Sequence, residues 1–191
     1  MKAFQIIPII LLIILVSCGE EETPVVVEAE EKIEELLHYD GENHSAPLFA
    51  AGSNAVATLF PLSVVRQHQG KHLSEIRFYI AELPQNLILT VHKGSWLQAT
   101  NEIVYEQNLT DQLQAEQWMA HQLSNPITLG EQDLWIVLTF TDFESGHFMG
   151  CDSGPQRPSG ALHLADMSDQ WETFFLDVNW NIRGVLTDGG N

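Results

Sequence analysis

The sequence predicts an all-β protein, a jelly-roll-like antiparallel β-sandwich of roughly eight or nine strands with one short helix. Two observations carry this prediction. From His38 onward, short runs of alternating apolar and polar residues recur between turn signals, and no long helical period interrupts them. The chain has 191 residues, 45% hydrophobic and 18% charged, which is typical of a folded globular domain. This length fits one domain with a tail.

The expected strands follow one another along the chain. They cover residues 55–62, 76–81, 87–93, 103–106, 118–123, 134–141, 161–164, 173–176 and 180–186. The run 134–141 is the strongest, because it is apolar on both faces at Trp135 and Val137, and we place it in the centre of a sheet. The helix is expected over 64–69, with Ser63 as its N-cap and Gly70 just past its end.

The alternation also predicts which side chains share the core. The expected core residues are Ile76, Phe78, Leu89, Val91, Leu134, Ile136, Leu138, Trp180 and Ile182. The strand tryptophans Trp118, Trp135 and Trp180 are assigned to the core as well.

Residues 1–17 have the features of a secretory signal peptide. Lys2 precedes an apolar run over 4–16, which would span roughly 20 Å as a helix. The hydrocarbon core of a bilayer is about 30 Å thick, so a signal peptide fits better than a transmembrane anchor.

The run ends in Leu-Val-Ser-Cys-Gly at 15–19, which resembles the lipobox of bacterial lipoproteins. The resemblance implies that the signal is cut before Cys18 and that this residue carries the lipid. Two or more acyl chains hold a protein stably on a bilayer. The alternative is an ordinary secretory signal followed by a chance cysteine.

Residues 18–36 are interpreted as the lipidated cysteine and an acidic tether. The segment contains the glutamates Glu20, Glu21, Glu22, Glu28, Glu30, Glu31, Glu34 and Glu35. Like charges keep such a segment extended and solvated, although 29–37 could form a short helix. One interpretation is a plain spacer. The other is that the acidic run resembles the surface-export signal of Bacteroidetes lipoproteins, which implies the outer face of the outer membrane.

Several short pieces between residues 37 and 187 occur in the order found in a known type of domain. They are 38–40 (His-Tyr-Asp), 70–73 (Gly-Lys-His-Leu), 76–79 (Ile-Arg-Phe-Tyr), 89–91 (Leu-Thr-Val), 104–107 (Val-Tyr-Glu-Gln), Trp118, 126–129 (Pro-Ile-Thr-Leu), 133–136 (Asp-Leu-Trp-Ile), 150–155 (Gly-Cys-Asp-Ser-Gly-Pro) and 179–183 (Asn-Trp-Asn-Ile-Arg). This order resembles the β-sandwich adhesion-type domains of secreted and surface proteins of Bacteroidetes. The resemblance implies a sandwich over 37–187, a tail over 188–191 and a non-catalytic binding role. Those domains are appended to proteases and adhesin arrays, whereas this one is expected to stand alone on its anchor.

Charge and cysteine content exclude several classes of function. Only 8 Lys and Arg stand against 26 Asp and Glu, a net charge of −18, so neither nucleic acid nor an anionic lipid surface is an expected partner. The two cysteines, Cys18 and Cys151, exclude a disulfide framework. Cys151 stands beside Asp152 and is expected to be a buried, poorly reactive thiol.

No catalytic motif is evident, and the protein is not expected to be an enzyme. Gly-x-Ser-x-Gly is absent from the sequence, and His68 and His72 straddle Gly70 instead of sharing a helix face. The acidic pairs 142/144 and 166/169 could serve a glycosidase, but no sugar-cleft pattern accompanies them. A structural calcium ion remains open. Its oxygens would come from Asp40, Glu42, Asp142, Glu144 and Asp152.

The ligand surface is predicted at the irregular segment 145–160, because a loop of this length in a compact domain is usually functional. Asp152 offers an acceptor and Arg157 a forked donor, with Trp96 or Trp171 beside them as an aromatic platform. The alternatives are that Asp152 only braces the edge of the sandwich and that the loop tryptophans fold back on it as lids.

Three hypotheses for function follow. The first is a binding or adhesion module for a surface glycan or protein. The second is a structural or accessory envelope lipoprotein with no small ligand, and the third is a hydrolase. An aromatic cleft would favour the first, a flat apolar patch the second, and a carboxylate or histidine cluster in a deep pocket the third.

Overall fold

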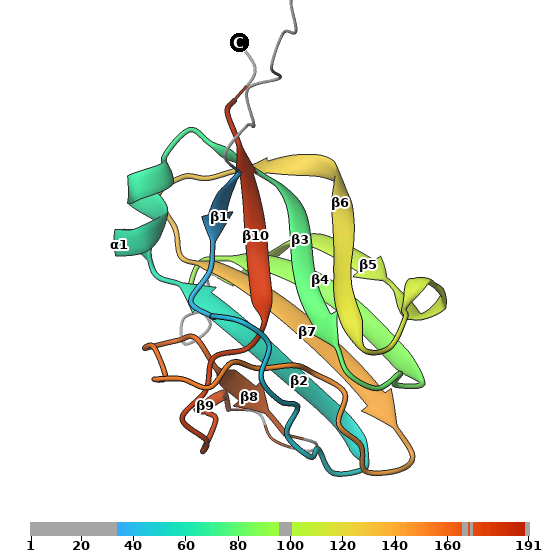
Figure 1. Cartoon of the computed structure of the whole chain (residues 1–191). Helices are drawn as coiled ribbons and strands as arrows, with labels where there is room; N and C mark the ends of the chain where they lie inside the picture. Colours follow the sequence, from blue (N-terminus) through green and yellow to red (C-terminus); the bar gives the residue numbers. More distant parts are fainter. Residues whose placement is uncertain (1–33, 96–100, 166–167, 169, 190–191) are drawn as a thin grey trace, which may run out of the picture. The chain divides into compact units, whose positions relative to one another are not determined.

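The fold is an all-β sandwich, as predicted (Figure 1). The computed structural model describes residues 34–95, 101–165, 168 and 170–189, and the structural statements below concern these residues. The signal peptide, Cys18 and the tether up to residue 33 lie outside them. Ten strands form two antiparallel sheets. Within the described part of the chain, no helix has the length and apolar content needed to cross a membrane.

The smaller sheet has four strands in the order β1 (Glu35–Leu37), β10 (Ile182–Thr187), β3 (His72–Ile80) and β6 (Gln117–Thr128). The larger sheet has six strands in the order β5 (Glu102–Asn108), β4 (Asn86–Lys93), β7 (Leu134–Asp142), β2 (Gly52–Phe60), β8 (Leu162–Leu164) and β9 (Glu172–Thr173). The remaining elements are the helix α1 (Leu62–Val65) and the 3-10 turns η1 (Arg66–His68) and η2 (Thr110–Gln112).

One hydrophobic core fills the space between the sheets. All nine residues predicted to share it do so, and Leu138 is completely buried. The predicted strand phase is therefore correct, since a slip of one residue would turn each of these side chains outward.

Strand β7 is central, as predicted, with β4 and β2 on its two sides. Its outward-facing residues Trp135 and Val137 form a second buried cluster with Ala55 and Ala57 of β2. Trp171 packs on this cluster, with its ring centroid 5.9 Å from that of Trp135. Both faces of the larger sheet are therefore covered around β7, which explains why this strand carries apolar residues on both faces.

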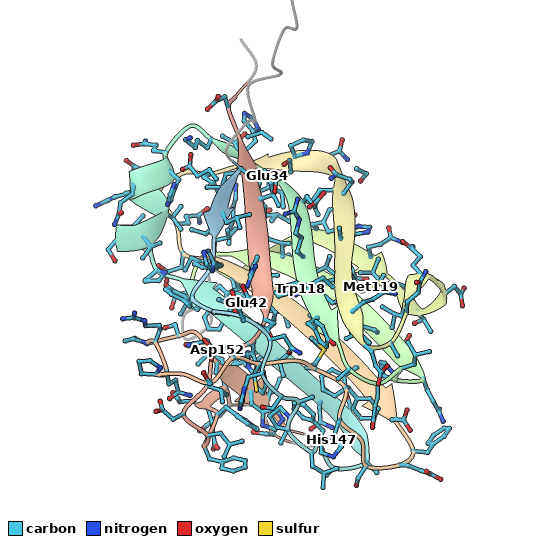
Figure 2. The ribbon with its side chains drawn as sticks, in the orientation of Figure 1. Glu34, Glu42, Trp118, Met119, His147 and Asp152 are labelled. Atoms are coloured by element: carbon cyan, nitrogen blue, oxygen red, sulfur yellow. The ribbon has the colours of Figure 1, made fainter. Side chains whose placement is uncertain are left out.

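Trp118 was wrongly assigned to the core. It stands opposite Tyr79 in the pairing of β6 with β3, on the outward face of the smaller sheet, and it is half-buried (Figure 2). The guanidinium carbon of Arg183 lies 4.2 Å from the centroid of its ring. Its neighbour Met119 packs against the core instead, so the strand was predicted correctly but the inward position is one residue later.

The segment before the sandwich also differs from the prediction. Residues 35–37 do not form the end of a helix. They form strand β1, which pairs with β10 and buries Leu37 in the core. So short a helix is marginal alone, whereas the edge of β10 offers both hydrogen bonds and a place in the core. Arg77 binds the carboxylate of Glu34 through two hydrogen bonds of 2.7 and 2.9 Å, which fastens the start of β1.

The short helix begins and ends earlier than predicted. Pro61, not Ser63, is its N-cap residue, and the turn after Val65 is a 3-10 turn. Asp133 accepts a 2.7 Å hydrogen bond from the Leu62 backbone amide, which replaces a side-chain cap. Gly70 follows with a φ of 85°, a conformation that favours glycine.

Candidate functional site

A pocket of about 310 Å³ opens where β2 begins and β8 and β9 end. We call it the Phe49 pocket. Its lining residues are Leu48, Phe49, Ala50, Ala51, Asn54, His163, Ala165, Phe174 and Phe175. Phe49 and Phe174 are buried and form its floor, whereas Leu48 and Phe175 are 62% and 83% exposed and form its rim. An exposed ring beside a concave apolar surface is a feature typical of binding sites.

The floor of the pocket is fixed by aromatic packing. Phe174 lies against the buried Trp180 with ring centroids 4.7 Å apart, and Phe49 lies 5.8 Å from the same ring. The ring centroids of Phe175 and Phe174 lie 4.7 Å apart. The exposed rim therefore rests on a rigid hydrophobic base.

The polar side chains of the pocket, His163 and Asn54, are bonded to each other. His163 Nε2 lies 3.2 Å from Asn54 Oδ1, and Asn54 Nδ2 donates to the Ala50 carbonyl oxygen at 3.0 Å. Burial lowers the pKa of His163, although the charge of Glu172 acts in the opposite direction, so the imidazole is neutral near pH 7 and donates to Asn54. The two side chains thus use most of their hydrogen-bonding capacity within the protein.

A smaller hollow of about 160 Å³ adjoins the pocket. The two share Asn54 and Ala165, and the smaller one is further lined by Ser53, Thr139 and Leu164 among others. His163 and Leu164 point to opposite faces of the sheet, because neighbouring residues of a strand alternate. The hollows therefore meet around the end of β8.

The segment 145–152 is ordered by backbone pairing. Cys151 bridges Ser45 on one side and Trp180 on the other. Cys151 is completely buried, as predicted, and burial raises the pKa of its thiol. A Cβ atom on Gly150 would stand 2.5 Å from Asn43 Oδ1 and 2.7 Å from Tyr79, so this close approach requires glycine.

Asp152 is 5% exposed, and its carboxylate accepts four hydrogen bonds from protein donors. Oδ1 accepts from the amides of Gly154 (2.9 Å) and Asn179 (2.7 Å). Oδ2 accepts from the Gly41 amide (3.0 Å) and from Asn179 Nδ2 (2.9 Å). Burial alone would raise the pKa of Asp152, but these hydrogen bonds outweigh it and lower the pKa. These contacts fit the alternative in which Asp152 braces the edge of the sandwich. We call Asp152 and its partners Gly41, Gly154 and Asn179 the brace.

The brace also positions the rim of the pocket. Asn179 Oδ1 accepts from the Arg157 amide at 2.6 Å, which holds the segment after Asp152. Gln156 Nε2 then donates to the carbonyl oxygens of Phe174 and Leu176, each at 3.0 Å. The backbone on both sides of Phe175 is thereby fixed.

Of the four residues predicted to border a ligand, the three that the structure describes do not line the Phe49 pocket. Asp152 is buried in the brace, and the Arg157 side chain is exposed. Trp171 is half-buried over Trp135, in the lid arrangement. Trp96 lies outside the described residues. Their roles in ligand binding stay predictions.

Sequence reasoning missed the pocket itself. Its rim comes from two irregular segments, around Leu48 and around Phe175. The strand expected over 173–176 was wrong there, because β9 ends at Thr173 and leaves Phe175 outside it. One signal was present. Phe174, Phe175 and Leu176 form an apolar triplet in an acidic, polar stretch, and two of the three residues are exposed in the structure.

The acids proposed as calcium ligands do not converge. Asp40 accepts hydrogen bonds from Asn181 and Arg183, and the Asp142 carboxylate accepts from the amides of residues 85 and 144. Across the described residues, no three His, Cys, Asp or Glu side chains are grouped so that they could hold a metal ion. The five candidate acids, all of them among the described residues, therefore do not form a calcium site together.

The pocket and the start of β1 lie at opposite ends of the sandwich. Glu34 marks the end where the chain enters β1, and His147 marks the other (Figure 2). His147 Nδ1 lies 2.6 Å from the Ala46 carbonyl oxygen, next to the pocket segment. Strands β8 and β9 are at the same end as His147 (Figure 1).

Comparison with known proteins shows the fold but no family. No protein-family model matches the chain, and no curated protein matches it significantly. It is similar to the structure of the cysteine protease and lectin-like domains of Cwp84, a surface layer associated protein of Clostridium difficile. The TM-score is 0.52 at 9% identity, over 75% of this chain and 36% of that one. A structure of the clostridial protease Cwp84 after propeptide cleavage gives 0.55 at 10% identity, over 81% and 40%.

The chain thus spans less than half of either matched chain. At this identity the likeness shows a shared fold, that of a β-rich domain from a surface-associated protein. Neither structure links the chain to Bacteroidetes.

Proposed function

We propose that this protein is a lipid-anchored β-sandwich that serves as a binding or adhesion module at the cell surface and catalyses no reaction. The observation that carries the proposal is the Phe49 pocket. It joins a rigid aromatic floor to an exposed apolar rim, and its titratable side chain, His163, is a neutral partner of Asn54. Such a site favours the binding of an apolar group over acid–base chemistry.

The sequence and the position of the pocket support the proposed location. The lipobox-like residues 15–19 would carry the lipid, and the acidic tether would join it to the sandwich at β1. The pocket lies at the end of the sandwich opposite to β1, so the tether does not enter the domain beside it (Figure 2). The proposed location of the protein is the outer face of the outer membrane.

The solved structures support the proposal through their fold. A surface layer associated protein carries the same fold in a domain described as lectin-like. A sandwich that presents loops at its end for recognition is a common arrangement, because the sheets hold the loops rigidly. The partner of the present module is a surface glycan or a protein.

The test is to apply the full chain carrying Cys18→Ser, which releases it from the lipid, to a glycan array and to a panel of purified envelope proteins. Phe175→Ala should abolish or weaken the binding found. Phe143→Ala is the matched control, because Phe143 is 80% exposed and does not line the pocket. Binding that survives Phe175→Ala would place the site elsewhere. If neither panel yields a ligand, the accessory lipoprotein takes the place of the binding module.

A further inference from the structure

The Phe49 pocket is small and poor in polar groups, and both properties restrict its ligand. Seven of its nine lining residues are apolar, and the other two, Asn54 and His163, are bonded to each other. A sugar needs several converging donors and acceptors for its hydroxyl groups, which this lining does not supply.

The volume of the Phe49 pocket also argues against a glycan ligand. A pocket of about 310 Å³ lies at the lower end of the usual range for small-molecule sites, which is about 300–1,000 Å³. This is room for one aromatic or branched aliphatic side chain and too little to enclose an oligosaccharide.

The segment of the chain that carries β8, β9 and Phe175 is acidic. Residues 142–181 contain seven Asp and Glu, with Arg157 as the one Lys or Arg. Glu172 and Asp177 flank the Phe174–Phe175 pair in the chain, and both are exposed. The charge of Glu172 reaches His163 in the pocket wall. A ligand centred on Phe175 would therefore have an exposed carboxylate near it in the chain on either side, at Glu172 and at Asp177.

We propose that the Phe49 pocket binds a protein partner by taking one bulky apolar side chain whose neighbours in the partner are lysines or arginines. The inference rests on the proposed function, and it narrows the partner from glycan or protein to a basic, amphipathic polypeptide segment. The apolar side chain would contact Phe49, Phe174 and Phe175, and the basic neighbours would pair with Glu172 and Asp177. Burial of apolar area at a fixed point supplies affinity, and the acidic rim supplies charge selectivity.

The experiment uses an array of short synthetic peptides that varies two properties independently. One is a central Phe, Leu or Ala, and the other is flanks of Lys, Ser or Glu. The probe is the full chain with Cys18→Ser. We expect binding only when an apolar centre and Lys flanks occur together, and we expect it to weaken as salt rises from about 50 mM to about 500 mM.

Two pairs of variants, each first checked for a native circular dichroism spectrum, locate the site. Phe175→Ala should weaken binding of the Lys-flanked Phe peptide by about tenfold or more, and Phe143→Ala should not. Glu172→Gln on edge strand β9 should weaken it several-fold. Glu102→Gln, an equally exposed glutamate on β5 at the other edge of the same sheet, should not.

Other outcomes separate this inference from the function on which it rests. Peptides selected without basic flanks, or equal effects of the paired variants, would overturn the inference. A glycan whose binding depends on Phe175 would overturn it as well, while leaving the binding module intact. Failure of every peptide, every glycan and every envelope protein to bind would remove both.

Discussion

Replacing Asp152 distinguishes its two interpretations, brace and ligand-binding residue. In Asp152→Asn the shape is kept, but one oxygen becomes an NH₂ group. Each oxygen of the native carboxylate accepts two N–H donors, so in either orientation the new amide donor faces two other donors. The amide cannot satisfy this site by rotating.

The magnitude follows from the donors that lose their acceptor. A buried hydrogen-bonding group left unsatisfied costs about 1–3 kcal/mol, and bonds to a charged acceptor are at the upper end of the range. Two donors lose their partner in Asp152→Asn, so we expect a loss of about 2–6 kcal/mol in the free energy of unfolding. For a domain of this size that corresponds to a fall of roughly 5–25 °C in Tm.

The assay is urea unfolding of the full chain carrying Cys18→Ser, followed by tryptophan fluorescence, with Glu144→Gln as the control. Glu144 is exposed, and its substitution should change stability by less than about 0.5 kcal/mol. If Asp152→Asn unfolds at the wild-type urea concentration but no longer binds the ligand, the bracing interpretation is wrong and Asp152 belongs to the binding surface.

The same residue sets a dependence on pH. Its pKa is lowered in the folded protein, so its contribution to stability is complete above the unfolded pKa of about 4. The contribution is lost as pH falls below that value and through the folded pKa. The stability difference between wild type and Asp152→Asn should therefore be constant at neutral pH and shrink below about pH 4.

Three further predictions concern the core, the thiol and the anchor. Leu138→Ala should reduce the free energy of unfolding by about 2–5 kcal/mol in urea titrations, whereas Leu83→Ala, at a residue that is 53% exposed, should change it little. Cys151 should react with a thiol reagent only after unfolding, because it is buried and its thiol pKa is raised, and rapid labelling of the native protein would contradict this. Wild type should partition into detergent, and Cys18→Ser should either release the protein or trap the uncleaved precursor. A cleaved Cys18→Ser protein that stays with membranes would disprove lipidation.

The fold could be predicted because strand periodicity in this chain follows burial closely. The inward residues of β3, β4 and β7 are the alternating apolar ones, and the two-sided pattern of β7 marked its central position. Prediction failed where a residue can face either way. Trp118 and Met119 are both large and apolar, and only the pairing of β6 with β3 determines which of them turns inward.

Strand β1 was missed for a different reason. A run of three residues has no period to detect, and its glutamates suggest a solvated segment. The structure uses those charges: Arg77 pairs with Glu34, and His68 and Lys71 pair with Glu35. The partners lie in β3 and the turn before it, far along the chain, so local sequence could not reveal the strand.

The most specific sequence motifs and the pocket occupy different residues for a physical reason. Gly150 and Asp152 have a fixed identity because a close approach and four hydrogen bonds leave room for nothing else. Phe175 meets no such constraint: its side chain is largely exposed, and it is positioned through backbone atoms that Gln156 holds. Because Gln156 holds only backbone atoms on either side of Phe175, the Phe175 side chain can be replaced without loss of these hydrogen bonds. The rim could therefore be fitted to a partner without disturbing the sandwich, and the residues that we propose to bind the partner are those that belong to no sequence motif.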